Sequence, residues 1–179
     1  TIAPDDLEPF QVYCDMTSYD DDGGGWITFQ RRMEQAGGQE NFYRVWADYK
    51  AGFGKLDGEH WLGNDKLNRI TNAFDCEARI DMCQYDGTTC SWQTFGRFSV
   101  DDEDNKYQIT ILDTTTSQEN LPGRSDKRID RWYYHNTRFF TTYDVDNDVW
   151  GGYNNGYYNC ARHYKGGWWY GSCHYLNYN

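Results

Sequence analysis

The sequence predicts an α+β fold, with a central antiparallel β-sheet, short helices and a loop-rich C-terminal region. Three observations support this prediction. Residues 74–83 alternate apolar and polar side chains, which is typical of a strand with one wet face. Residues 41–53 and 63–71 have the amphipathic pattern and neighbouring glycines of short helices. Beyond Phe140 the chain is dense in Asp, Asn, Gly, Tyr and Trp, and regular structure is sparse in such a segment.

The N-terminal third predicts two strands joined by a turn and followed by the two helices. Residues 10–16 alternate in polarity, and residues 26–32 resume a strand-like composition. Between them, residues 20–25 read DDDGGG, which is a turn of charge and glycine. In the second helix, either Asn64 or Asp65 is available to cap the first turn.

A hairpin is predicted after the strand at 74–83. The Asp86–Gly87 pair is a strong two-residue turn signal, and such a turn places Cys83 opposite Cys90. Their Cα atoms then lie about 5.5 Å apart or less, within reach of a disulfide. We therefore predict a Cys83–Cys90 disulfide; the alternative is two free cysteines. Cys76 points to the apolar face of its strand, where it is a buried free thiol or pairs elsewhere.

The remaining middle segment predicts a strand at residues 106–116 and a long surface loop at 113–138, where apolar periodicity is weak. The 179 residues are enough for one domain with a sizeable core and too few for two. We expect a single domain, residues 1–179, with an N-terminal subregion (1–50), a central sheet subregion (51–138) and a C-terminal subregion (139–179).

Composition restricts the function classes. The net charge of −11 disfavours nucleic acid and anionic membranes as partners, and is compatible with metal cations, neutral sugars or basic protein surfaces. Hydrophobic content is 38%, and no stretch is apolar enough to insert into a bilayer. Six cysteines without a CxxC pair indicate an oxidising compartment, so we expect a secreted, extracellular protein.

Three aspartates, Asp144, Asp146 and Asp148, occupy alternate positions in the C-terminal subregion. Such carboxylates repel one another unless a cation lies among them, and hard oxygen ligands select Ca²⁺. An EF-hand does not fit, because Val149 stands where glycine is needed and Asn155 where glutamate is needed. The pattern predicts a different calcium loop; the alternative is a solvated acidic turn.

Four stretches of the sequence resemble the fibrinogen C-terminal, or fibrinogen-related, domain of ficolins, tachylectins, angiopoietins, tenascins and the fibrinogen chains. They run in family order from about Pro9 to His174. They are PFQVYCDM followed by GGGWITFQRR, then WADYKAGFGKLDGEHWLGNDKLNRIT, then YHNTRFFTTYDVDND, and finally NCARHYKGGWWYGSCH. The resemblance implies the fold of that domain.

The resemblance also implies a ligand set for the calcium ion. The side chains of Asp146 and Asp148 would hold it, together with the backbone carbonyls of Trp150 and Gly152. Asp144 would be an outer acid that does not contact the ion directly.

Beside the calcium loop, the resemblance implies a disulfide between Cys160 and Cys173 and a ligand pocket. In several members the peptide bond before the second cysteine is cis, here Ser172–Cys173, and it aims backbone N–H groups into the pocket. In the acetyl-recognising lectins this pocket takes an N-acetyl group, with walls that correspond to Tyr164 and His174. In the fibrinogen chains a related pocket takes a peptide N-terminus, and an acid stands in place of Tyr164.

The sequence departs from the family pattern in three places. The link YNNGYYN before Cys160 is longer than usual. The chain ends at CHYLNYN, whereas family members continue further, so we expect either a shortened variant or a fragment. The family partner of Cys14 lies upstream, which leaves Cys14 unpaired, bridged to Cys76 or joined to another chain.

The resemblance implies a secreted, calcium-dependent lectin for N-acetylated glycans in innate immunity or agglutination. The alternative is an extracellular protein-interaction or matrix module of the angiopoietin, tenascin or fibrinogen type without sugar binding. An enzyme is not expected, because the four histidines accompany no nucleophile pattern such as GxSxG. We expect homo- or hetero-oligomers, formed through regions outside this chain.

Overall fold

A computed structural model describes residues 1–16, 25–34, 37–83, 90–118, 129–151, 158–174 and 177–179. It has the α+β architecture that the sequence predicts, with short helices and antiparallel strand pairs. In sequence order the elements are β1 (Tyr13–Asp15), β2 (Trp26–Thr28), β3 (Gln30–Arg31), α1 (Trp46–Ala51), β4 (Phe53–Gly54), β5 (His60–Trp61), α2 (Asn64–Ala73), β6 (Cys76–Cys83), β7 (Cys90–Val100), β8 (Ile109–Gln118), the 3-10 helix η1 (Ile129–His135), β9 (Phe140–Thr141), α3 (Cys160–Tyr164) and β10 (Trp168–Trp169).

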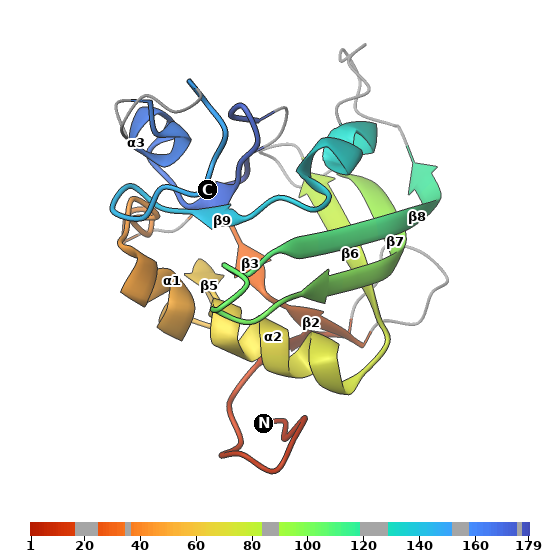
Figure 1. The fold of residues 1–179 in the computed structure, drawn as a ribbon. Coiled ribbons are helices and arrows are strands. Elements are labelled where there is room, and N and C mark those ends of the chain that lie inside the picture. The colour runs from red at the N-terminus through yellow and green to blue at the C-terminus, as the bar shows by residue number, and fades with distance from the viewer. Residues whose placement is uncertain (17–24, 35–36, 84–89, 119–128, 152–157, 175–176) are drawn as a thin grey trace.

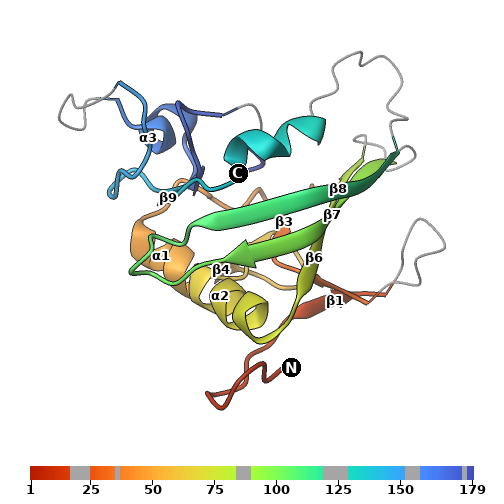
Figure 2. The same ribbon diagram turned by 45° about the vertical axis from the view of Figure 1, so that its right-hand side comes forward.

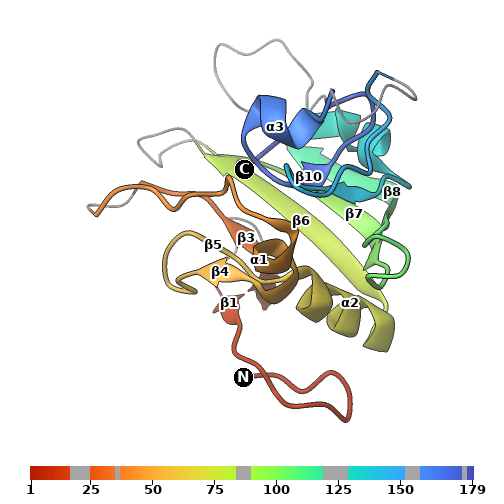
Figure 3. The ribbon, with the colours of Figure 1, turned by 60° about the vertical axis from the view of Figure 1, so that its left-hand side comes forward.

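The central sheet consists of the three long antiparallel strands in the order β6-β7-β8. Helix α2 lies along one side of this sheet, whereas η1, β9 and α3 lie on the other side (Figures 1 and 2). The side chains of Asn68 and Thr71 hydrogen-bond the carbonyl of Val100, which ties α2 to the end of β7. The small three-stranded sheet β3-β5-β4 lies beside α1 (Figure 3).

The hairpin register agrees with the sequence-based prediction, because β6 and β7 pair with Cys83 opposite Cys90. Cys83 is disulfide-bonded. The side chain of Cys90 lies outside the described residues, so the predicted bridge stays a prediction. Cys14 is exposed and free, and Cys76 is half-buried and free, so the structure contains no Cys14–Cys76 bridge.

Helix α1 is shorter than the predicted helix at 41–53. Asn41 accepts a hydrogen bond from the backbone N–H of Tyr43, an Asx turn that competes with helix formation. Val45 is extended, and the helix begins at Trp46. Helical pattern alone therefore overestimated this element at its N-terminal side.

The predicted caps of α2 are wrong. Its N-cap is Gly63, with φ +115°, and no side chain caps the helix. Asn64 is instead the first helical residue and is fully buried, where its Oδ1 accepts a hydrogen bond from Trp61 Nε1 at 3.0 Å. The demand of the buried indole N–H for a partner outweighs the capping preference of asparagine.

The predicted surface loop at 113–138 is wrong at both ends. Strand β8 continues to Gln118, which pairs with Trp92 of β7. Residues 129–135 form η1, which buries Trp132 and His135. Trp132 is the one apolar residue of this pair, so no apolar periodicity reveals the helix in the sequence. Residues 119–128 lie outside the described part of the protein.

The core is built largely from aromatic rings. Trp61 of β5 contacts Tyr49 of α1, Phe140 of β9 and both tryptophans of β10, with ring centroids 5.4 to 6.4 Å apart. These rings come from segments that lie far apart in the sequence. Within the described ranges, no helix is long and apolar enough to cross a bilayer.

Candidate functional site

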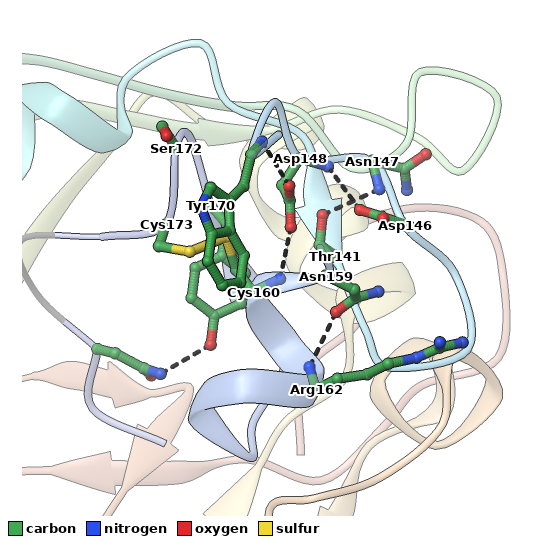
Figure 4. Close-up of a disulfide and its surroundings, with 12 residues drawn as sticks. Thr141, Asp146, Asn147, Asp148, Asn159, Cys160, Arg162, Tyr170, Ser172 and Cys173 are labelled. Carbon is green, nitrogen blue, oxygen red and sulfur yellow. Dashed lines mark hydrogen bonds between the residues drawn. A yellow bond between two sulfur atoms is a disulfide. The ribbon is translucent and has the colours of Figure 1, made fainter. Parts of the chain in front are cut away.

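The loop that follows β9 carries the three aspartates. Strand β9 pairs with β10, so the start of the loop is anchored in the core. Within the loop, the backbone N–H of Asn147 donates to Thr141 Oγ1 at 3.1 Å (Figure 4). The side chain of Asn147 donates to the carbonyl of Phe140 at 2.8 Å. Asn147 thereby holds the backbone on which Asp146 and Asp148 are placed.

Asp148 is the acid that connects this loop to the start of α3. Its Oδ1 accepts from the backbone N–H of Trp150 at 2.8 Å, and its Oδ2 accepts from that of Cys160 at 2.8 Å (Figure 4). Asp146 Oδ1 accepts from the backbone N–H of Asp148 at 3.2 Å. Each carboxylate oxygen retains a further lone pair. No Lys, Arg or His of the described residues forms an ion pair with either acid.

The electrostatics of the two acids favour a cation. Burial, together with the nearby charge of Asp146, raises the pKa of Asp148 to about 6, although two backbone hydrogen bonds act in the opposite direction. A bound cation would offset the repulsion between these two carboxylates. The donor set is entirely oxygen, so the residues fit Ca²⁺.

A calcium ion here needs backbone carbonyls as well as side chains. Among the described residues, no three His, Cys, Asp or Glu side chains are grouped to hold a metal. The predicted carbonyl ligands are those of Trp150, whose N–H binds Asp148, and Gly152, which lies outside the described residues. The ligand set thus stays a prediction.

Asp144 has a different role in the structure. Its carboxylate accepts from the backbone N–H of Trp46 at 3.0 Å and from the hydroxyl of Thr142 at 2.7 Å. It therefore ties the loop to the first residue of α1, whose backbone N–H has no acceptor within the helix itself. The expected role of Asp144 as an outer acid that does not contact the ion stays a prediction.

Helix α3 joins the loop to the disulfide. Asn159 caps α3, because its Oδ1 accepts from the backbone N–H of Arg162 at 2.9 Å, and its Nδ2 donates to the carbonyl of Thr142. A disulfide links Cys160 to Cys173, with Cα atoms 5.2 Å apart. The calcium loop, α3 and the segment around Cys173 thus form one connected unit.

The expected pocket residues lie together only in part. The rings of Tyr164 and His174 are in contact, with centroids 4.2 Å apart. Tyr164 is 42% exposed, whereas both ring nitrogens of His174 are buried and have no hydrogen-bond partner among the described residues. Burial lowers the pKa of His174, so the ring is neutral at physiological pH.

The expected cis bond at Ser172–Cys173 is wrong for this structure, since no cis peptide bond occurs among the described residues. Cys173 instead adopts φ +62°, in the left-handed region. The N–H of Ser172 donates to the hydroxyl of Tyr134 at 3.0 Å. A cis bond at a non-proline residue costs about 3 kcal/mol, and the trans form observed here avoids that cost.

Sequence reasoning missed several residues of this region. Asn159 carries a readable signal, because asparagine directly before a short helix is a preferred N-cap. Tyr134 carries none, since its contact with Ser172 spans 38 positions. A cavity of about 460 Å³ was also not foreseen, and it is lined by Trp150, Tyr158, Asn159, Arg162 and His163.

Comparison with known proteins places this protein in a family. The fold is that of a fibrinogen-like globe, a mixed α+β domain. The family model described as the C-terminal globular domain of fibrinogen beta and gamma chains matches residues 1–179, and the chain therefore belongs to this family. The family is non-enzymatic, its members commonly bind calcium, and the homologues are matrix or secreted proteins.

Three similar proteins illustrate the relationship. Human tenascin-R is 44% identical over 172 residues, which are 96% of this chain and 11% of that protein. The fibrinogen-like globe domain of human ANGPTL2 superposes with a TM-score of 0.79 at 32% identity, over 96% of this chain and 69% of that one. Lamprey fibrin D-dimer, complexed with the peptide Gly-His-Arg-Pro-amide, gives a TM-score of 0.71 at 28% identity, over 93% of this chain and 50% of that one. The chain thus spans a small part of the tenascin-R length.

Proposed function

We propose that this protein is a calcium-supported extracellular recognition module that binds a protein partner. The observation that carries the proposal is a row of aromatic rings beside the disulfide, here called the aromatic row. Successive ring centroids lie 5.3, 5.4, 4.7 and 4.2 Å apart. In order, the rings belong to Tyr158, Trp150, His163, Tyr164 and His174.

The aromatic row suits a protein partner because aromatic side chains dominate binding energy at protein interfaces. Tyr158 and Tyr164 are each 42% exposed, so the row presents ring surface to solvent. Helix α3 buries Cys160 and Ala161 on its inner face and is clamped by the disulfide. A rigid platform loses little entropy on binding. The similarity to tenascin-R and to a peptide-binding fibrin supports this choice.

Calcium would be held by the carboxylates of Asp146 and Asp148 and the carbonyls of Trp150 and Gly152. When bound, it supplies positive charge that offsets the two acids. Asp148 also accepts from the N–H of Cys160, so the same carboxylate that holds the ion positions the start of α3. The ion therefore supports the aromatic row without contacting the partner.

Calcium binding can be tested by isothermal titration of the protein with CaCl₂. Asp148→Asn should weaken calcium binding at least about tenfold, because one of two ligand charges is removed. The matched control, Asp144→Asn, should change it by less than about threefold, since Asp144 contacts Trp46 and Thr142 instead. Equal losses in both variants would contradict the assigned ligand set.

Partner binding can be tested on an array of purified extracellular proteins, with and without EGTA. We expect calcium-dependent binding to at least one protein that Tyr164→Ala abolishes. The control is Phe74→Ala, which removes an exposed ring, 58% exposed, at the far end of α2. Binding that persists both in the Tyr164→Ala variant and in the presence of EGTA would contradict the proposal.

A lectin for N-acetylated glycans is the second candidate, and one observation favours it. The Tyr164–His174 contact brings together the two rings that correspond to the walls of an N-acetyl pocket. Retention on N-acetylglucosamine-agarose, lost with EGTA and competed by acetate, would establish this function. Binding unaffected by either reagent would exclude it.

A further inference from the structure

The cavity of about 460 Å³ at one end of the aromatic row has the size of a small-ligand site. Trp150 forms its central wall, with Tyr158 at 5.3 Å and an angle of 55° on one side. His163 stands on the other side at 5.4 Å, nearly edge-on at 70°. Three rings at steep angles make a concave surface that fits a rigid, compact body better than a flat one.

Arg162 supplies the charge of the cavity. Its Nε donates to the carbonyl of Tyr143 at 2.7 Å, and its backbone N–H donates to Asn159, so its position is held at two points. None of the described residues accepts a hydrogen bond or forms an ion pair with its terminal nitrogens. These donors are free to bind a ligand.

The side-chain amide of Asn159, which also lines the cavity, is not available to bind a ligand. Asn159 uses its Oδ1 for Arg162 and its Nδ2 for Thr142, so its amide is satisfied within the protein. Among the described residues, no aspartate or glutamate lines the cavity, although the protein has a net charge of −11. The cavity thus combines aromatic walls with one free guanidinium, which favours an anion and disfavours a cation.

We propose that this cavity binds a carboxylated sugar ring, with the pyranose packed against Trp150 and its carboxylate paired with Arg162. The negative face of an aromatic ring attracts the weakly positive C–H groups of a sugar. The planar guanidinium matches a carboxylate in a bidentate pair. An acidic peptide side chain has the carboxylate but lacks a stiff ring to fill the aromatic walls.

The cavity shares Trp150, Tyr158 and His163 with the aromatic row, but Tyr164 does not line it, so Tyr164→Ala separates the two proposals. The test is an NMR titration that follows the Trp150 indole N–H, assigned with Trp150→Phe, in the presence of calcium. The probes are sodium D-glucuronate, sodium N-acetylneuraminate and D-glucose. Glucose is the matched control, because it keeps the ring and lacks the carboxylate of glucuronate.

We expect one or both acids to shift the Trp150 signal in a saturable way, at least about tenfold more tightly than glucose. Arg162→Gln should weaken that binding at least about tenfold. Lys165→Gln, the charge-matched control, should leave it within about twofold, because Lys165 lies over the ring of Tyr43 and does not line the cavity. Whichever acid binds identifies the sugar source.

Tyr158→Ala provides a second variant that leaves the calcium loop contacts of Arg162 in place. It should weaken the acid at least about threefold while the calcium titration stays unchanged. Equal affinity for glucuronate, N-acetylneuraminate and glucose would overturn the proposal. So would a shift produced by poly-glutamate and by neither acid sugar, since that result would identify an acidic peptide site.

Discussion

His135 shows how burial decides the chemistry of a single residue. The ring is fully buried in η1, and its Nδ1–H donates to the carbonyl of Trp169 at 2.8 Å. Burial lowers its pKa to about 4, although the hydrogen bond to Trp169 acts in the opposite direction. Its neutral form therefore belongs to the folded state at physiological pH.

This residue predicts a loss of stability in mild acid. The folded pKa lies below the unfolded value of 6.5, so the stabilising contribution is complete above pH 6.5. It is lost as the pH falls from 6.5 through 4, and amounts to about 3 kcal/mol over that window. Urea unfolding at pH 7, 5.5 and 4 measures it. His135→Gln is the control, and the wild-type and variant slopes should differ; parallel curves would refute the assignment.

At the same scale, several polar residues have roles that their sequence context does not reveal. Asp144 belongs to the acidic motif, yet it binds the backbone of Trp46, 98 positions away. Asn64 has the signature of a cap, yet it accepts from the indole of Trp61. The residue types are readable, but the partner is set by segments that only folding brings together.

At the scale of elements, Gly52 determines how closely the end of α1 approaches the backbone at the end of β5. It ends α1 with φ +94°, and a Cβ placed there would lie 2.2 Å from the carbonyl oxygen of Leu62. Two rigid backbones meet at this position, and neither can move without disturbing the core residue Leu62.

Gly52→Ala is therefore expected to cost about 3 kcal/mol or more of unfolding free energy. The matched control is Gly25→Ala, whose φ of +92° imposes similar strain but whose Cβ meets nothing within 4 Å. It should cost only about 1 kcal/mol. Chemical denaturation of both variants compares the two, and equal losses would show that strain alone, rather than contact, matters.

Helix α3 couples the calcium loop to the disulfide. Asp148 accepts from the N–H of Cys160, and the N–H of Val149 donates to the carbonyl of Gly171, two residues before Cys173. Both ends of the bridged segment therefore touch the loop. By linkage, the factor by which the disulfide changes calcium affinity equals the factor by which bound calcium changes the equilibrium for forming the disulfide.

The double variant Cys160→Ser/Cys173→Ser should bind calcium at least about tenfold more weakly, since the closed loop restricts the backbone by about 3 kcal/mol. Conversely, calcium should slow reduction of this disulfide by a phosphine, followed by mass spectrometry. Cys83→Ser/Cys90→Ser, in the hairpin of the central sheet, is the control and should leave calcium affinity unchanged. Unaltered affinity in the first variant would break the proposed coupling.

Elements with a regular pattern were predictable and those with an irregular one were not. The alternation at 74–83 located β6, and the Asp86–Gly87 turn signal set the register of Cys83 with Cys90. The 3-10 helix η1 was missed because one tryptophan, Trp132, packs against Phe95 and Trp168 without any repeat. A repeating pattern of apolar residues reveals the buried face of an element, whereas a single buried side chain produces no repeat in the sequence.

At the scale of the whole molecule, aromatic contacts join the N-terminal and C-terminal segments. Trp61 contacts Trp168 and Trp169, and Tyr49 accepts from the backbone N–H of Gly167 at 2.9 Å. Tyr49 then donates to the carbonyl of Phe42 at 2.6 Å. The boundaries proposed at residues 50 and 138 are therefore crossed by buried contacts.

We predict that the protein unfolds as a single cooperative domain. In calorimetry with saturating calcium, the calorimetric and van't Hoff enthalpies should agree. Amide exchange should give β5 and β10 the same global protection, since their tryptophans pack together. Two separate transitions, or β10 exchanging well before β5, would show that the C-terminal subregion folds independently.

The sequence by itself determined the fold class, the family, the hairpin register and the oxygen-rich loop, because each rests on neighbouring residues or on a local pattern. Tertiary structure alone decided that the N–H of Ser172 binds Tyr134 beside a trans peptide bond, and that Asp144 holds Trp46. It also aimed Arg162 at Tyr143 and so left its outer nitrogens free at an aromatic cavity. The physical reason is that these contacts join residues 19 to 98 positions apart in the sequence. The composition around either residue therefore does not indicate its partner.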